Sequence, residues 1–392
     1  MMTSFATVLF AASLAGIVYV YAGYPALVAL LAHLYPRPVL RRPITPRVSV
    51  IVAAYNEETA IEAKIHDTLG NGYPRARLEI VVASDGSTDA TEVRAHAVGA
   101  PEVTVMRLPR RGKLAALEAG VAAATGEILV FTDADVLLAP GSIERLVENF
   151  ADPEVGGVAG QKQVRAREGA TGVARGEGLY ARFDEWQKSM ESRFGSAVAS
   201  HGALHAVRRE LFARGGDPSG ADDMSISMRV VLQGHRLVLD PRAVALVHPP
   251  SGAGTELRRK VRIANQVIRA LLDLGPALWT SGFYSVQLVS HKLLRYMVPF
   301  FLALVLVSSA ILAFQGGFPW REVLAVQIAF YALAALGALL QGRSAGRRRA
   351  LSIPYYFCLV NAAAALSVLA VLRGERMALW HPGAGSQPEA SS

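Results

Sequence analysis

The sequence has little cysteine and little charge. Cys358 is the single cysteine among 392 residues, so no disulfide can form within one chain. Charged residues make up 18% of the chain and hydrophobic residues 52%, which is more hydrophobic than an ordinary soluble domain needs. The first absence excludes an intrachain disulfide framework, and the second indicates a membrane protein.

Asp, Glu, Lys and Arg are absent from residues 1–36, 297–320, 323–342 and 351–372. Because about 20 apolar residues cross a bilayer, these stretches predict four membrane helices, one N-terminal and three C-terminal. The first stretch has no basic residues before its apolar part, so we expect it to be retained and not cleaved as a signal peptide.

Arginines follow the first uncharged stretch and separate the third from the fourth: Arg37, Arg41, Arg42, Arg47, Arg343, Arg347, Arg348 and Arg349. The positive-inside rule then predicts an integral protein of a bacterial-type inner (plasma) membrane. Residues 37–296 would be cytoplasmic and both termini outside, although Arg373 and Arg376 leave the side of the C-terminal tail open.

The net charge of +8 is spread in short groups beside apolar stretches, without the interleaved aromatic residues of a single-strand binding surface. We therefore expect no nucleic-acid partner. Anionic lipid headgroups and phosphorylated substrates explain the charge more simply.

Between residues 47 and 150, apolar strands alternate with helical patterns. The strands are expected at residues 47–54, 78–84, 102–108 and 126–135, and helical patterns such as 57–69 and 112–125 lie between them. Near-continuous Val, Ile and Leu in strands with helix-length connections predict a parallel sheet covered on both faces. The fold class is therefore doubly wound α/β, in which ligands bind at the carboxyl ends of the strands.

Acidic turns follow three of these strands, at residues 54–57, 84–89 and 132–135. Some of their polar residues, such as Ser87 or Asp89, are also expected as turn formers and helix caps. Three such turns at one sheet edge would create a negative potential that calls for a cation. The basic stretch Arg107 to Lys113 suits an anion in the same cleft.

Asp133 and Asp135 are separated by one alanine in "FTDAD". In an extended chain, residues two apart point to the same side, so both carboxylates would face one ligand. Oxygen ligands favour Mg²⁺ or Mn²⁺, with water and substrate phosphates completing the shell. The alternative is a solvated turn that caps a helix beginning near Gly141, and no His/Cys cluster offers a zinc site.

Two further segments carry candidate residues. Asp222 and Asp223 precede a helical pattern, where an Asp pair is on structural grounds alone more often a helix cap than a catalytic group. Residues 256–274 have an apolar stripe, while Arg259, Arg262, Gln266 and Arg269 share another face. This pattern predicts an amphipathic helix at the membrane surface, whose arginines bind either a substrate or only lipid headgroups.

Seven segments in this order resemble the membrane-embedded branch of family 2 glycosyltransferases, which includes cellulose, chitin and hyaluronan synthases. They lie between Val48 and Leu272: "VSVIVAAYNEE", "VVASDGSTDAT", "GKLAALEAG", "FTDAD", "GALHAVRREL", "ADDMSISMRVVLQGHRLVLDP" and "RRKVRIANQVIRA". The resemblance implies a Rossmann-like GT-A domain that uses a nucleotide sugar, most often a UDP-sugar. By similarity, the nucleoside would be held by Tyr55, Glu57 and Asp85.

The resemblance also assigns the reacting groups. Lys113 would approach the diphosphate, and Asp133 and Asp135 would be the DxD pair that binds the metal. Asp223 would be the base, in a place where the family has Glu-Asp and this chain has Asp222 before it. One base and direct displacement imply inversion at the anomeric carbon.

The family's QxxRW motif matches Gln266 and Arg269, which would lie near the diphosphate, whereas Ala270 replaces the tryptophan of the acceptor site. His201 and Gly202 fall in the family's acceptor region, although a structural histidine at position 201 is equally compatible with the sequence.

The sequence thus predicts a metal-dependent, inverting glycosyltransferase that extends a polysaccharide, with export through its own helices as an option. The alternative is transfer of one sugar to a membrane lipid, such as a polyprenyl phosphate or a sphingolipid-like alcohol. The expected order is a membrane helix (1–36), a cytosolic GT-A domain (37–255), interfacial helices (256–295), three membrane helices (296–373) and a flexible tail (374–392).

Overall fold

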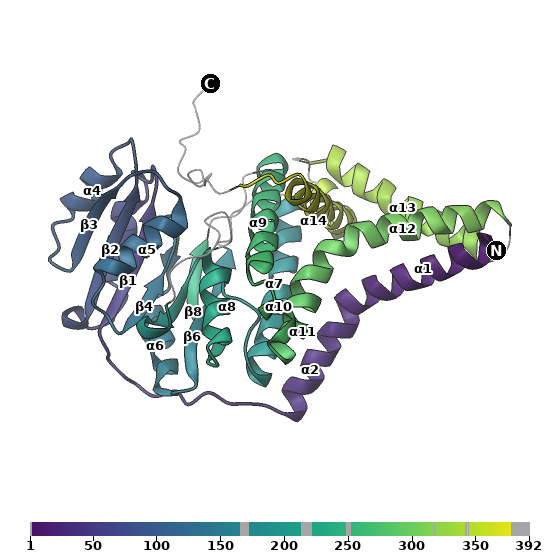
Figure 1. Ribbon diagram of the computed structural model, residues 1–392. Coiled ribbons are helices and arrows are strands. Elements are labelled where there is room, and N and C mark those ends of the chain that lie inside the picture. Colours follow the sequence, from purple (N-terminus) through teal and green to yellow (C-terminus); the bar gives the residue numbers. More distant parts are fainter. Residues whose placement is uncertain are drawn as a thin grey trace, which may run out of the picture.

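The computed structural model describes residues 2–164, 172–212, 222–247, 252–316, 318–341, 343 and 345–377. An α/β domain and a group of long apolar helices lie side by side, with α7, α8 and α9 between the sheet and the apolar helices (Figure 1).

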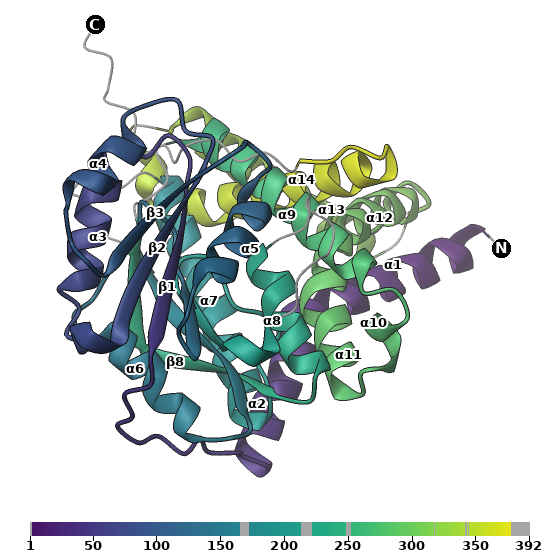
Figure 2. The same ribbon diagram turned by 60° about the vertical axis from the view of Figure 1, so that its left-hand side comes forward.

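The first half of the sheet is parallel and has the strand order β3-β2-β1-β4. Its strands are β1 (Val48–Ala54), β2 (Leu78–Asp85), β3 (Val103–Leu108) and β4 (Ile128–Phe131). The chain passes between them through α3 (Ile61–Leu69), α4 (Thr91–Ala97) and α5 (Lys113–Ala123), as Figure 2 shows. The predicted doubly wound arrangement of these strands is confirmed.

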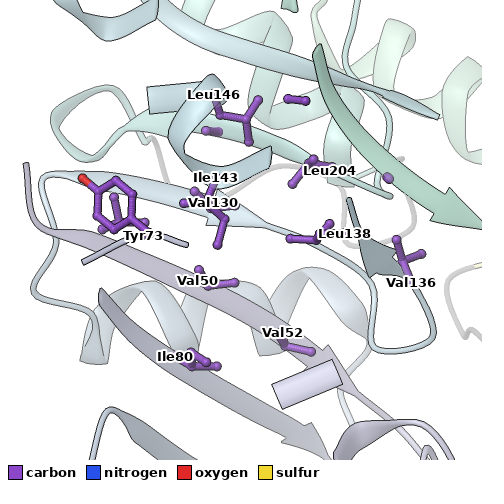
Figure 3. Close-up of a cluster of buried hydrophobic side chains, with 14 of the residues drawn as sticks. Val50, Val52, Tyr73, Ile80, Val130, Val136, Leu138, Ile143, Leu146 and Leu204 are labelled. Atoms are coloured by element: carbon purple, nitrogen blue, oxygen red, sulfur yellow. The ribbon is translucent and has the colours of Figure 1, made fainter. Parts of the chain in front are cut away.

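Apolar residues alternate between two cores along these strands. Val50, Val52, Ile80 and Val130 belong to the first core, which Ile143 and other residues of α6 (Ser142–Glu148) complete (Figure 3). The second core lies on the opposite face and contains Ile51, Ala53, Val81 and Phe131. Both faces are therefore buried, which fixes the strand ends rigidly at one edge.

The second half of the sheet is not parallel throughout, which the sequence did not predict. Its strands are β5 (Leu137–Leu138), β6 (Val155–Val164), β7 (His205–Arg208) and β8 (Arg236–Val247), and the full order is β3-β2-β1-β4-β7-β6-β8-β5. β7 pairs antiparallel with both β4 and β6. β5 also pairs antiparallel with β8, so the sheet as a whole is mixed.

Three longer helices connect this half to the apolar region: α7 (Gly172–Phe194), α8 (Asp222–Leu232) and α9 (Ala253–Asp273). The amphipathic helix expected at 256–274 is α9, and Val267 and Leu271 on its apolar side pack in a third cluster with Leu288. Short elements complete the domain: η2 (Arg75–Arg77), η3 (Asn149–Ala151), η4 (Arg209–Leu211), α10 (Ala277–Thr280) and α11 (Phe283–Gln287).

Within the part of the chain that the structure describes, four helices are long and apolar enough to cross a membrane: Thr3–Leu34, Phe283–Phe314, Trp320–Leu339 and Arg349–Leu372. The first contains α1 (Met2–Val18), η1 (Tyr19–Gly23) and α2 (Tyr24–Leu34). The second joins α11 through η5 (Leu288–Leu293) to α12 (Leu294–Phe314), and α13 (Trp320–Leu339) and α14 (Arg349–Leu372) follow. This agrees with the predicted one N-terminal and three C-terminal apolar helices.

Both ends of α14 lie against the α/β domain. The turn before it, η6 (Ala345–Arg347), contacts α7. After it, the carbonyl oxygen of Glu375 accepts hydrogen bonds from Asn265 (3.2 Å) and Arg269 (2.6 Å) of α9. The beginning of the tail, whose side the sequence left open, therefore lies with α9.

Candidate functional site

The predicted nucleoside residues follow β1 and β2. Tyr55 lies one residue beyond the end of β1, and Asp85 is the buried last residue of β2. The guanidinium carbon of Arg110 lies 3.1 Å from the centre of the Tyr55 ring, and its Nη1 donates to Asp85 at 3.1 Å. Arg110 thus joins two of the expected residues, Tyr55 and Asp85, and the sequence pattern had indicated Arg110 only as part of the basic stretch Arg107 to Lys113.

Asp85 also shapes the loop before α5. Its carboxylate accepts hydrogen bonds from the backbone N–H groups of Arg111 (2.7 Å) and Gly112 (3.0 Å). Gly112 has a φ of 97°, a conformation that favours glycine. These bonds fix the start of α5 and therefore the position of Lys113. Glu57 is buried nearby, and its backbone N–H donates to Thr91 at 2.8 Å.

Lys113 joins two acidic segments that are far apart in the sequence. Its Nζ lies 2.8 Å from Oδ1 of Asp133 and 3.0 Å from Oδ2 of Asp222. Burial opposes the charge of Lys113, but the two carboxylates outweigh it and hold the pKa of the lysine above its ordinary value. The ammonium group is therefore a permanent positive charge between the end of β4 and the start of α8.

The DxD pair occupies a turn and not an extended strand. β4 ends at Phe131, so the expected strand conformation at Asp133 and Asp135 is wrong. The chain bends because Ala134 and Val136 turn into the first core, which leaves the two aspartates only half-buried. As predicted, the two aspartates and Ala134 point to different sides: Ala134 is buried in the first core, and the aspartates are not.

The residues at this turn fit a divalent metal only as part of an open site. Among the described residues there is no group of three or more His, Cys, Asp or Glu side chains suited to a metal ion. Asp133 and Asp135 are oxygen ligands, and a Mg²⁺ or Mn²⁺ ion held by one or two carboxylates completes its shell with water and substrate phosphates. The pair fits an ion that binds together with a diphosphate, and it does not fit a closed protein cage.

The two acids at the start of α8 differ in their protonation. Burial raises the pKa of Asp223 to about 6, and the charge of Asp222 is the second cause. Burial also opposes ionisation of Asp222, but the Lys113 ammonium outweighs it and lowers the pKa of that carboxyl. Asp222 is thus held as an anion, whereas Asp223 can take up a proton near neutral pH.

The two predicted acceptor residues, His201 and Gly202, precede β7 in the chain. A Cβ atom on Gly202 would lie 3.2 Å from Nζ of Lys113, so the backbone of Gly202 borders the charged cluster directly. Neither ring nitrogen of His201 has a hydrogen-bond partner in the part of the chain that the structure describes. Burial lowers the pKa of His201 to about 3, which keeps the ring neutral.

His205 is a buried residue that sequence reasoning missed. Its ring stacks on Phe131 with centroids 4.9 Å apart, and burial lowers its pKa to about 4. Asp222, Lys113 and Asp133 are the charged groups that act on it. A histidine within the apolar strand "HAVR" was the single sequence signal of this position.

On α9, the residues that match QxxR face the beginning of the tail. Nε2 of Gln266 donates to the carbonyl of Met377 at 3.0 Å, and Arg269 donates to that of Glu375. Ala270 is 2% exposed and packs in the third apolar cluster, so the position of the family's tryptophan is inside the protein.

The family model of Glycosyl transferase family 2 matches residues 49–216. Similar proteins include N-acetylglucosaminyltransferases of Rhizobium sp. (strain N33), 25% identical over 299 residues, and of Azorhizobium caulinodans, 28% identical over 242 residues. The alignments cover 72% and 58% of this chain and 65% and 61% of those proteins. The chain therefore spans slightly less than two thirds of their length.

A poly-β-1,6-N-acetyl-D-glucosamine synthase of Staphylococcus aureus is 24% identical over 55% of this chain and 53% of its own. Among solved structures, a mannosyltransferase from Pyrobaculum calidifontis in complex with GDP-Man and Mn²⁺ is 26% identical and has a TM-score of 0.72. That match covers 96% of this chain and all (100%) of the other, so the likeness includes the apolar helices as well as the α/β domain.

Proposed function

The chain is a family 2 glycosyltransferase, and on that premise we propose that it extends a polysaccharide with sugars from a UDP-sugar at the cytoplasmic face of a membrane. The curated relatives are named for N-acetylglucosamine, which makes UDP-N-acetylglucosamine the first donor to examine. Export of the product through the apolar helices is part of this proposal.

One observation carries the proposal. Lys113 bridges Asp133 at the end of β4 and Asp222 at the start of α8, so a donor-binding edge and a second acid pair meet in one site. A metal-binding pair alone, or a helix-capping acid alone, has many structural explanations. Their convergence on one ammonium group is expected where a diphosphate leaves and an acceptor is deprotonated.

In the proposed reaction each residue has a separate role. Asp223 accepts the proton of the acceptor hydroxyl, whose oxygen forms a bond to the anomeric carbon while the bond from that carbon to the diphosphate oxygen breaks. The electron pair of the broken bond leaves with the nucleoside diphosphate, beside Lys113. Asp133 and Asp135 would hold a divalent metal, which would supply positive charge for that leaving group. Attack from the opposite face inverts the anomeric configuration.

A second candidate acceptor is a membrane lipid. The observation that favours it is Ala270, because its buried position leaves no aromatic platform where the polysaccharide synthases have tryptophan. The donor chemistry is unchanged, and a single sugar is added to a polyprenyl phosphate or a sphingolipid-like alcohol.

A donor screen on the full-length protein in nanodiscs tests the function. UDP-N-acetylglucosamine, other UDP-sugars and GDP-mannose are each supplied with Mn²⁺, and release of the nucleoside diphosphate is measured. Water-soluble chains of increasing size support the polysaccharide, and one solvent-extractable product carrying one sugar supports the lipid acceptor. Absence of sugar transfer from every donor would contradict both.

A further inference from the structure

The segment between α7 and β7 is buried although it forms neither helix nor strand. Val198, Ala199 and Ser200 are exposed by 5% or less, and they directly precede His201 and Gly202. Polar backbone groups in a buried segment need hydrogen-bond partners, because an unpaired group is costly away from water. Here the partners come from two parts of the molecule, the catalytic helix α8 and the apolar helices.

One end of the segment holds the start of α8. Oγ of Ser200 donates to the backbone carbonyl of Asp223 at 3.1 Å, and the N–H of Ser200 donates to Oγ of Ser227 at 3.2 Å. Ser227 donates in turn to the same Asp223 carbonyl at 2.8 Å. These three hydrogen bonds form a closed ring that fixes the backbone of Asp223, whereas the carboxylate of Asp223 takes no part in the ring.

The other end of the segment is held from α7 by Glu191, a fully buried carboxylate. Oε2 of Glu191 accepts a hydrogen bond from the N–H of Val198 at 3.0 Å. Its Oε1 accepts one from the hydroxyl of Tyr24 at 2.7 Å, and Nδ1 of His291 lies 2.7 Å from the same oxygen. Tyr24 belongs to the first apolar helix and His291 to the second, so one carboxylate joins both apolar helices to the segment.

The second apolar helix also contacts the segment directly. The hydroxyl of Tyr284 donates to the carbonyl of Val198 at 2.8 Å, and Nε2 of Gln287 donates to the carbonyl of Ser196 at 2.8 Å. Because Val198 and Ser200 are only two residues apart in a buried backbone, a shift of the apolar helices is transmitted over a short distance to the ring at Asp223.

We propose that Glu191, Tyr284 and Ser200 are positioning residues, which make the place of Asp223 depend on how the two apolar helices pack. The inference rests on the proposed function, because it takes Asp223 as the base. A base must lie within hydrogen-bond distance of the proton that it accepts, so a small displacement lowers the transfer rate. The hydrogen bonds of this path involve neither Lys113 nor Asp133, so donor binding should not depend on them.

The test is a double-mutant cycle on the full chain in nanodiscs. Ser200→Ala removes the hydroxyl that reaches Asp223, and Tyr24→Phe removes the one that reaches Glu191. Nucleoside diphosphate release at saturating donor and acceptor gives kcat for each variant and for the pair. Calorimetry with Mn²⁺ gives the UDP affinity, and melting curves check that the fold is retained.

Three further variants serve as controls. Tyr73→Phe is matched to Tyr24→Phe, because Tyr73 is also buried and donates to the carbonyl of Pro46 at 2.6 Å, but it packs in the first core. Ser200→Thr keeps a hydroxyl and should restore most of the rate that Ser200→Ala loses. Tyr284→Phe, which removes the contact with Val198, takes the place of Tyr24→Phe in the cycle if that variant does not fold.

We expect Ser200→Ala and Tyr24→Phe each to lower kcat about two- to tenfold, as the loss of one hydrogen bond would, with UDP affinity unchanged within about twofold. The double variant should lose much less than the product of the two effects, because both changes interrupt one path. Tyr73→Phe should leave kcat unchanged.

An unchanged kcat in Ser200→Ala would overturn the inference, and so would effects of Ser200→Ala and Tyr24→Phe that simply multiply. Weakened UDP binding in the folded variants would also overturn it, because the path would then reach the donor site. Absence of sugar transfer by the unmodified protein would instead contradict the proposed function, and the inference with it.

Discussion

The two halves of the sheet contribute different chemistry to one site. The half formed by β3, β2, β1 and β4 is parallel, and its acids are held by direct contacts. Asp85 accepts hydrogen bonds from backbone N–H groups, and Asp133 forms an ion pair with Lys113. The half formed by β7, β6, β8 and β5, with α8, contributes groups that are neutral or able to titrate, namely Asp223, His201 and His205.

The proposed function gives a physical reason for this difference. A donor with two phosphates needs fixed charges that are present before it binds, because such charges need no reorganisation during the reaction. In the proposed reaction Asp223 is the base and must change its protonation within each cycle. Burial and the neighbouring Asp222 raise its pKa to about 6, which suits that role. Lys113 is the contact at which the two halves meet.

The largest effect is expected for the acceptor half. Asp223→Asn removes the proposed proton acceptor and should lower the transfer rate by about 10²–10⁴-fold, the range for loss of a general base. The measurement is nucleoside diphosphate release with a saturating donor and acceptor. Glu210→Gln, an exposed change in the same half, is the control and should retain the unmodified rate.

Unchanged turnover in Asp223→Asn would show that Asp223 is not the base, and Asp222 would be the next candidate.

For the donor half, Asp133→Ala should abolish the Mn²⁺-dependent part of UDP binding. The change removes one of two oxygen ligands and leaves Lys113 with Asp222 alone. Calorimetry with and without Mn²⁺ measures the metal contribution directly. Glu62→Ala, exposed on α3 of the same half, should bind UDP as the unmodified chain does. Equal metal dependence in Asp133→Ala would show that the ion is held elsewhere.

The pH profile sharpens the comparison between fixed and titrating acids. Asp223 must be ionised to accept a proton, so activity should fall about tenfold per pH unit below about 6 and level off above it. In Asp222→Asn the neighbouring charge is gone, and the midpoint of this acidic limb should move to lower pH. The measurement is kcat/KM against pH for both proteins, and an unmoved midpoint in the variant would contradict the coupling.

The smallest effect on activity is expected from a test of how the C-terminal chain is placed. Because the beginning of the tail contacts α9 and η6 contacts α7, both ends of α14 should lie on the side of the α/β domain. The chain would then cross the membrane with the other three apolar helices and not with α14. Reporter fusions at the two termini should therefore lie on opposite sides of the membrane while the enzyme stays active. Two reporters on the same side would show that α14 crosses.

The sequence predicted the first half of the fold well because its pattern is local. Strands of Val, Ile and Leu separated by helix-length segments specify β1 to β4, and the acids follow each strand directly. The second half depends on pairings between distant segments, such as β7 between β4 and β6, which hydrophobic periodicity does not encode.

In the candidate site, too, sequence patterns indicated residues but not their contacts across the fold. Asp133, Lys113 and Asp222 were named from motifs, but no pattern placed Lys113 between the two acids or stacked Arg110 on Tyr55. The turn at the DxD pair was missed because the strand-like run continues through it in the sequence, whereas Ala134 is drawn into the core.

The central claim is that donor binding and proton removal belong to separate halves of the sheet. UDP affinity of Asp223→Asn, measured with Mn²⁺ in nanodiscs beside the unmodified protein, tests it most directly. The account predicts the same affinity in a variant that has lost transfer. Loss of UDP binding in a folded Asp223→Asn protein would contradict it, because Asp223 would then belong to the donor site.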